Sequence, residues 1–225
     1  MKRLLFLLVF AVTISGVAVA QDFPRVEIYG GYSAQRLGIS DETLDGITSG
    51  MQDDLGDICS GCESSISSNR FLKKGFEGAF AVNVNRYFGF VVDVRYGFDD
   101  IVTGRVTNND DIDVNATIKY TDLSVMGGPR IAFRSESVTP FVHALFGMDR
   151  GKVTYELTGT STESGEIGDS NGIGIAVGGG FDVNLGDTVA LRLGQVDYYL
   201  TRHNEEFLKN VSFSGGIVFR FGWVY

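Results

Sequence analysis

Two cysteines separated by two residues form the most reactive side-chain pair of this 225-residue chain. Cys59 and Cys62 lie in the stretch Cys-Ser-Gly-Cys, between an Asp-rich and a Ser-rich sequence. Such a pair can do redox chemistry when it opens a helix after a strand, or it can bind a metal. This pair lacks that context, and the signal-like N-terminus described below indicates an oxidising compartment, where a disulfide is favoured. We expect a Cys59–Cys62 disulfide, with redox chemistry or metal binding as the alternatives.

The remaining chemical motifs are weak. The chain has only two histidines, His143 and His203, and nothing in their spacing supports a catalytic triad. The glycine run 172–180 lacks the third glycine and the helix of a dinucleotide-binding loop. The acidic stretch 108–113 lacks the glycine and the distal glutamate of a calcium-binding EF loop. We expect no catalytic, cofactor-binding or metal-binding residues.

The N-terminus has the pattern of a secretory signal peptide. A basic start (Lys2, Arg3) precedes an apolar run and the small-residue site Ala18-Val19-Ala20. We expect residues 1–20 to be removed and 21–225 to form one domain. Removing Lys2 and Arg3 changes the formal net charge from −9 to −11, so the chain is a poor candidate for nucleic-acid binding, which needs a basic surface. No later apolar run is long enough for a transmembrane helix.

Strict alternation of apolar and small or polar residues indicates β-strands. Eight segments show it, most clearly the last, where Ile217, Phe219, Phe221, Trp223 and Tyr225 occupy one face. A change of phase near Gly194–Gln195 suggests a bulge. The eight segments are 25–34, 75–85, 88–98, 115–130, 139–148, 172–183, 188–200 and 212–225.

Connections between these segments alternate in length. Three are tight turns (85–87, 134–138 and 184–187), and the others are expected to be long loops, at 35–73, 99–114, 149–171 and 201–209. Short turns at one end and long loops at the other are typical of an outer-membrane barrel. We predict an all-β fold, an eight-stranded antiparallel up-and-down transmembrane β-barrel.

The size of the side chains decides which face points outward. One face of the segments carries Phe, Tyr, Ile and Val, and the other carries Gly, Ala, Ser, Asn and a few charges. The interior of an eight-stranded barrel is only wide enough to be filled by side chains. The bulky apolar face should therefore contact lipid and the small, polar face should point inward. The alternative is a soluble envelope barrel or sandwich with the apolar face inside.

Charges on the inward face should pair, because buried charges persist only when they are paired and hydrogen-bonded. Glu27 and Arg220 lie on the two strands that must meet to close the barrel, and Glu77 falls opposite Arg95 across a turn. We expect ion pairs that fix the strand register rather than a polar pore. The further members of this network are Asp93, Asp182 and Arg192.

The C-terminal segment carries a family resemblance. The order polar-x-Gly-x-x-apolar-x-apolar is met by Ser214, Gly216, Phe219 and Phe221. It resembles the C-terminal signal by which the outer-membrane assembly machinery recognises its substrates. Four residues follow Phe221, so the terminal aromatic is either Phe221 or Tyr225.

Segments 140–147 and 190–201 resemble the small eight-stranded barrels of the OmpA/OmpX type, which are porin-like outer-membrane proteins. The resemblance implies an outer-membrane location, with the lipid bilayer and the assembly machinery as partners. We expect a structural or surface-interaction role through the long loops, with no enzymatic activity and an unidentified surface partner. The alternative is a small pore or hydrophobic-ligand conduit; an outer-membrane enzyme is a weaker one.

Overall fold

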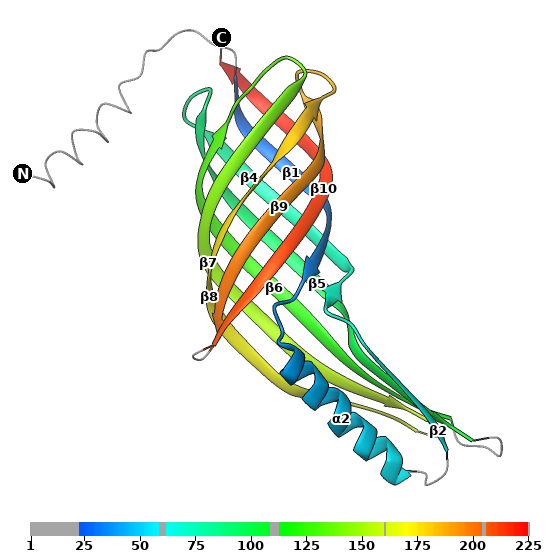
Figure 1. Cartoon of the computed structure of the whole chain (residues 1–225). Helices are drawn as coiled ribbons and strands as arrows, with labels where there is room; N and C mark the ends of the chain where they lie inside the picture. Colours follow the sequence, from blue (N-terminus) through cyan, green and yellow to red (C-terminus); the bar gives the residue numbers. More distant parts are fainter. Residues whose placement is uncertain (1–22, 59–61, 109–112, 160, 204–205, 225) are drawn as a thin grey trace, which may run out of the picture.

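The computed structural model describes residues 23–58, 62–108, 113–159, 161–203 and 206–224. Eight strands of this part pair with their neighbours into a closed antiparallel ring, as the sequence predicted (Figure 1). In ring order they are β1 (Phe23–Arg36), β4 (Lys74–Asn83), β5 (Phe88–Thr107), β6 (Asp113–Ala132), β7 (Val138–Thr158), β8 (Thr162–Asn184), β9 (Val189–His203) and β10 (Glu206–Val224). The predicted signal peptide, residues 1–20, lies outside the described residues.

The ring closes where β1 meets β10. Their register runs from Phe23 opposite Val224 to Arg36 opposite Val211. Gly31 lies opposite Gly216, and a methyl group added to Gly216 would lie 2.3 Å from the carbonyl oxygen of Gly30. Only glycine permits this close approach of the two backbones, so the seam depends on it.

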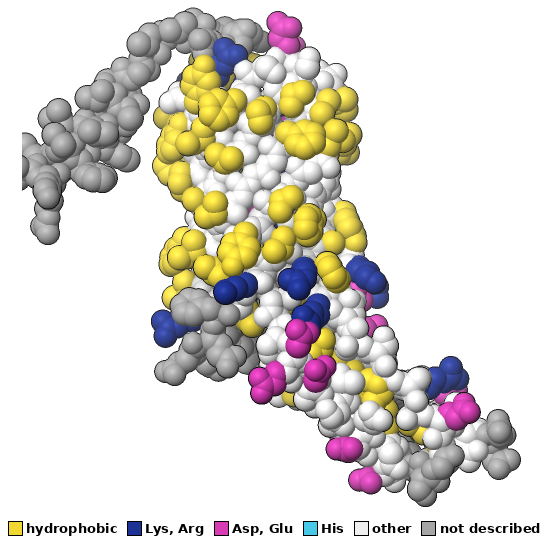
Figure 2. Space-filling view, in the orientation of Figure 1, with side chains coloured by type: hydrophobic (Ala, Val, Ile, Leu, Met, Phe, Trp, Pro, Cys, Tyr) yellow, Lys and Arg dark blue, Asp and Glu magenta, His cyan; other side chains and the backbone are white. Residues whose placement is uncertain are grey.

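The apolar face points outward, as predicted. Phe80 and Phe146 are 48% and 61% exposed, whereas Glu77, on the opposite face of β4, is 2% exposed. Figure 2 shows apolar side chains covering the barrel wall and giving way, toward one end, to Lys and Arg and then to Asp and Glu. An apolar outer wall with a polar interior is the arrangement of a barrel that faces lipid.

The three predicted tight turns are present at the end of the barrel where β1 begins and β10 ends (Figure 1). The predicted bulge is also confirmed. The pairing of β9 with β8 and with β10 shifts by one residue between Arg192 and Gly194–Gln195. We call this end of the barrel the turn end.

The prediction of long loops at the opposite end was wrong for three of the four connections. β5 continues to Thr107 and β6 starts at Asp113, so the expected loop 99–114 is mostly paired strand. The expected loop 149–171 is likewise the paired ends of β7 and β8, and strand pairing takes up most of 201–209. Interstrand hydrogen bonds stabilise these extensions, and their mixed polar composition weakens the alternation that would reveal a strand.

The fourth predicted loop, 35–73, contains a helix and two short strands. They are α2 (Asp41–Ile58), β2 (Glu63–Ser68), which pairs with β5, and β3 (Phe71–Leu72), which pairs with β1. Ser40 caps the helix by accepting a hydrogen bond from the Thr43 backbone N–H at 3.2 Å. Leu44, Met51 and Leu55 form its buried stripe at helical spacing. No helix among the described residues is long and apolar enough to cross a membrane.

Candidate functional site

The barrel interior contains two joined clusters of charged side chains. The turn-end cluster is centred on Glu27, which is 2% exposed. Arg134 donates a hydrogen bond to Glu27 at 2.8 Å, and Arg130 also donates one. Arg220 lies opposite Glu27 in the register, but its Nε is 3.9 Å away. The seam therefore brings the expected pair together, while Arg130 and Arg134, which the sequence reasoning missed, make the closer contacts.

Asp182 is the second carboxylate of the turn-end cluster. Arg192 donates hydrogen bonds to both of its oxygens, at 2.8 and 3.3 Å. Arg130 approaches it at 3.5 Å and Arg220 at 3.9 Å. Two carboxylates thus share four guanidinium groups in this cluster.

The central cluster is formed around Arg95, which is 2% exposed. Arg95 donates to Glu77 at 3.0 Å and to Asp197 at 2.6 Å, and it lies 3.5 Å from Asp93. His143 contacts the other oxygen of Asp197 at 2.7 Å. Three carboxylates here share one guanidinium group and one imidazole, so the charge excess is opposite to that of the turn-end cluster.

Gln195 connects the two clusters. Its amide oxygen accepts a hydrogen bond from Arg192 at 2.7 Å, and its amide nitrogen donates to Glu77 at 2.8 Å and to Asp197 at 2.7 Å. Five carboxylates and five guanidinium groups are then balanced within one network. The carboxylates are Glu27, Glu77, Asp93, Asp182 and Asp197, and the guanidinium groups are Arg95, Arg130, Arg134, Arg192 and Arg220.

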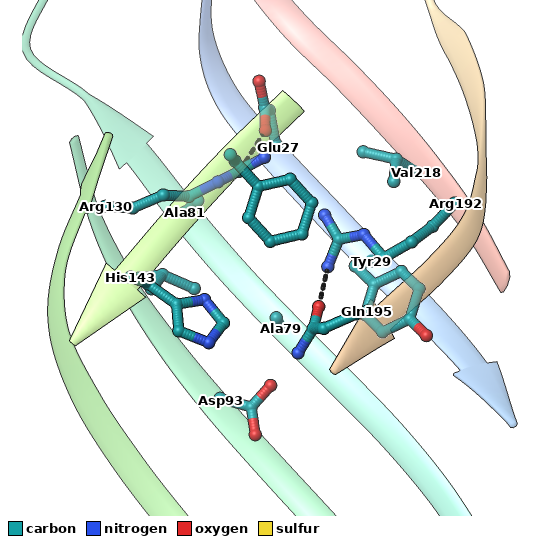
Figure 3. Close-up of a pocket in the computed structure, with 12 residues that line it drawn as sticks. Glu27, Tyr29, Ala79, Ala81, Asp93, Arg130, His143, Arg192, Gln195 and Val218 are labelled. Atoms are coloured by element: carbon teal, nitrogen blue, oxygen red, sulfur yellow. Dashed lines mark hydrogen bonds and ion pairs between the residues drawn. The ribbon is translucent and has the colours of Figure 1, made fainter. Parts of the chain in front are cut away.

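Aromatic rings fill the space between these charges (Figure 3). The Arg192 guanidinium lies 4.2 Å from the centre of the Tyr29 ring and 4.3 Å from that of Phe141. The Arg130 guanidinium also lies over the Phe141 ring, 4.4 Å from its centre. The cavity among these side chains measures about 10 Å³, the space of about one water molecule. The barrel is closed at this level.

Sequence reasoning missed four members of the network: Arg130, Arg134, Gln195 and Asp197. Arg130 follows a Gly-Gly-Pro sequence in the segment with the weakest alternation, and Arg134 falls in a predicted turn. The strand parity of Gln195 and Asp197 was hidden by the bulge. Reading the alternation backward from Tyr199 only as far as the bulge would have placed Asp197 and Gln195 on the inward face.

No described residue forms an accessible catalytic site of the kind weighed in the sequence. His143 is 6% exposed and lies inside the closed barrel. The side chain of His203 and residues 109–112 of the acidic stretch lie outside the described part. Among the residues that the structure describes, no group of three or more His, Cys, Asp or Glu side chains could hold a metal ion.

A second core of buried apolar residues is separate from the barrel interior. Its elements, among them α2 and β2, lie at the end of the barrel opposite the turns (Figure 1). This core joins α2, β2 and β3 to the projecting ends of β5 to β8, residues 99–107, 113–120, 150–158 and 162–171; we call this assembly the outer unit. Leu55 and Leu72 are 1% and 0% exposed, and Val102 and Val106 cover them from β5. Such burial of apolar side chains stabilises the outer unit as a structure in its own right.

A groove of about 540 Å³ runs between α2 and the projecting ends of β6, β7 and β8. Its α2 side contains Gly46, Gly50 and Asp54 beside buried Met51 and Leu55. Its strand side is lined mainly by apolar residues: Ala116, Ile118, Tyr155, Leu157 and Ile167.

Two further predictions concern the C-terminal assembly signal and the cysteine pair. Ser214, Gly216, Phe219 and Phe221 lie on β10, with Phe219 and Phe221 44% and 46% exposed on the outer wall, and Tyr225 lies outside the described residues. Cys62 is not a free thiol, but Cys59 lies outside the described residues. The assembly signal and the Cys59–Cys62 pairing therefore stay predictions.

Comparison with known proteins defines the class that this architecture represents. Residues 4–221 match the family model of the outer membrane protein beta-barrel domain. The chain belongs to this family, and it is an outer-membrane protein. None of the curated protein sequences matches it.

Solved structures of outer-membrane proteins also match the chain, at low identity. Ail, the attachment invasion locus protein of Yersinia pestis, is 15% identical over 88% of this chain and 99% of its own, with a TM-score of 0.48. Neisserial surface protein A is 15% identical over 89% and 99%, with a TM-score of 0.46. OprG of Pseudomonas aeruginosa is 11% identical over 90% and 96%, with a TM-score of 0.40.

Proposed function

We propose that this protein is a non-conducting outer-membrane anchor that presents its outer unit to molecules outside the cell, and that it has no enzymatic activity. The observation that carries the proposal is the separate apolar core of the outer unit, formed by α2, β2, β3 and the projecting strands. A barrel that served only to fill the membrane would need no such core beyond the lipid.

The interior network argues against the pore alternative. A hydrated ion needs a continuous aqueous path, and eight strands leave none when side chains fill the lumen. Here the rings of Tyr29 and Phe141 lie against Arg192, and the cavity beside them holds about 10 Å³. We expect no conductance steps when the purified protein is reconstituted in planar bilayers, with a general porin as positive control. Steps that appear in proportion to the protein added would overturn the closed-barrel part of the proposal.

The same network argues against an enzyme. His143 contacts Asp197 inside the barrel, where the surrounding charges and rings leave no room for a substrate. Its geometry is that of a structural partner that shares the carboxylate of Asp197 with Arg95.

The charge of the outer unit indicates the kind of surface it would meet. Helix α2 contains six carboxylates, at positions 41, 42, 45, 53, 54 and 57, and no basic residue. One solved structure of Ail holds the heparin analogue sucrose octasulfate; for the present chain, the acidic helix favours a cationic surface over such a polyanion.

Attachment of cells in a flow chamber tests this role. Cells producing the protein are compared with cells in which a Gly-Ser linker replaces residues 41–58, on glass that carries a cationic phenyl silane or its sulfonated counterpart. We expect the wild-type protein to raise attachment to the cationic surface, and the linker variant to lose the gain while its cold SDS resistance is kept. Equal attachment by both proteins would contradict the role of the outer unit.

A further inference from the structure

We propose that the groove between α2 and strands β6 to β8 binds a small amphiphile with an apolar body and a cationic head. The inference rests on the proposed function in one respect, that the outer unit faces the outside medium. Small-ligand sites are mostly apolar clefts of about 300–1,000 Å³ with a few polar groups that orient the ligand. The groove, at about 540 Å³ with a largely apolar lining, has these properties.

The groove remains open although apolar residues line it. Ile167 is 58% exposed and Tyr155 is 36% exposed, and both lie at the groove on strands that project from the barrel. Apolar surface left uncovered on a folded unit marks an interaction site. The charged residues Arg150 and Lys152 precede Tyr155 along β7 and make exposed ion pairs with Asp169 and Glu166. Exposed charges of this kind belong in water and not in lipid, so the groove lies beyond the lipid-facing part of the barrel. Membrane lipid is therefore not expected to fill it.

Two glycines of α2 leave space in the groove because they carry no side chains. Gly46 and Gly50 lie one turn apart on α2, and a methyl group added to either would meet no atom within 4 Å. A glycine inside a helix costs about 1 kcal/mol relative to alanine. Packing within the protein does not require these glycines, whereas a ligand that lies against the helix would.

Charge decides the kind of head group. Glu156 and Asp54 are the two carboxylates at the groove. Lys119 pairs with Glu156, and this hydrogen bond raises the pKa of Lys119. The Glu156 carboxylate therefore already has a partner within the protein. Asp54 is exposed, and within the described part of the chain it has no hydrogen-bond or ion-pair partner. A carboxylate without a partner beside an apolar groove favours a ligand that carries a positive charge at one end.

The test uses the whole protein in nanodiscs with labelled methyl groups. The probes are 4-phenylbutylammonium and 4-phenylbutyrate, which share the apolar body and differ in the sign of the head, and empty nanodiscs correct for partition into lipid. We expect the cation to shift the methyl resonances of Met51, Ile118 and Ile167, and the anion to bind about fivefold or more weakly.

Three variants separate the groove from the rest of the helix. Gly50→Leu fills the groove and should weaken binding of the cation about tenfold or more. Gly56→Leu is the matched control, because Gly56 is also an exposed α2 glycine whose added methyl group would meet nothing within 4 Å, but it does not line the groove. It should bind as the wild type does. Asp54→Asn should remove most of the preference for the cation.

Equal binding of the two probes, equal effects of Gly50→Leu and Gly56→Leu, or resonance shifts confined to methyl groups of the barrel wall would each overturn the proposal. Loss of cell attachment on replacing residues 41–58, together with no probe binding, would refute the groove and leave the proposed function standing. Probe binding without any effect of the replacement on attachment would do the reverse.

Discussion

Replacing Arg95 with methionine should destabilise the barrel more than any exposed arginine replacement. Arg95 is the one guanidinium group close to Glu77, Asp93 and Asp197, at 3.0, 3.5 and 2.6 Å, in the described central cluster. All four side chains are at most 4% exposed. Removing one partner of a buried ion pair costs about 3–5 kcal/mol, because the other charge is left uncompensated. Here three carboxylates lose their shared cation, so we expect a loss of about 3 kcal/mol or more.

The assay is unfolding by urea in lipid vesicles, followed by the difference in mobility between folded and unfolded protein in cold SDS gels. The matched control is Arg150→Met, because Arg150 makes an ion pair with Asp169 at 2.7 Å but is 57% exposed. An exposed pair contributes about 0–1 kcal/mol. The Arg95→Met protein should unfold at clearly lower urea, and the control should stay close to the wild type.

A second substitution makes the test sharper. Glu77→Gln alone should destabilise the protein, because Arg95 loses a partner that it contacts at 3.0 Å. In the Arg95→Met protein the same substitution should stabilise, because it removes one uncompensated carboxylate. A Glu77→Gln effect of the same sign in both proteins, or an Arg95→Met protein as stable as Arg150→Met, would refute the idea that these charges hold the barrel together.

Three further predictions concern the seam, the outer unit and its hairpin. Gly216→Ala should lower the free energy of unfolding by about 1–3 kcal/mol in the same urea assay, because the added methyl group would lie 2.3 Å from the Gly30 carbonyl oxygen. The control is Gly30→Ala, whose methyl group would meet nothing within 4 Å and which should be nearly neutral. Equal effects of the two substitutions would contradict the close approach of the strands. Leu55→Ala should lower the stability of the outer unit by about 2–5 kcal/mol, seen as faster hydrogen exchange in α2, without changing the cold SDS resistance of the barrel; loss of that resistance would show that the two parts fold as one. Arg105 donates hydrogen bonds to Asp113 at 2.8 and 2.7 Å, and this lowers the pKa of the Asp113 carboxyl. The pair should therefore be intact above the unfolded pKa of about 3.9 and be lost as the pH falls through the lower folded value, which a carboxyl NMR titration with Arg105→Gln as control would measure.

The sequence predicted the number of barrel strands, the face of each strand that points outward, and the ion pairs between neighbouring strands. Alternation assigns each side chain of a strand to one face, and a tight turn fixes which residues lie opposite each other. The turn after β4 thus placed Glu77 opposite Arg95, and barrel closure placed Glu27 opposite Arg220. Both pairings are local consequences of register.

Contacts across the lumen could not be predicted from the sequence. Arg95 reaches Asp197, which lies 102 positions away on a strand that is not its neighbour. Such contacts depend on the tilt of the strands and the stagger of the barrel, which alternation does not encode.

Helix α2 was missed for a different reason. Gly46, Gly50 and Gly56 interrupt its helical pattern, and glycine is a poor helix former. Its stability comes from packing Leu44, Met51 and Leu55 against strands that are distant in sequence. Polar pairing in the β5–β6 and β7–β8 extensions likewise gave no apolar alternation to detect.

Labelling of single cysteines in intact cells tests the central claim, a closed barrel whose outer unit faces outward and whose tight turns face the periplasm. Ser49→Cys places a thiol on the exposed side of α2, and Asp187→Cys places one in the exposed turn between β8 and β9. A membrane-impermeant maleimide should label Ser49→Cys in intact cells, and Asp187→Cys only after the outer membrane is permeabilised, with the wild-type chain as background. Labelling of Asp187→Cys but not Ser49→Cys in intact cells would contradict the orientation, and equal labelling of both would contradict a barrel that spans the membrane.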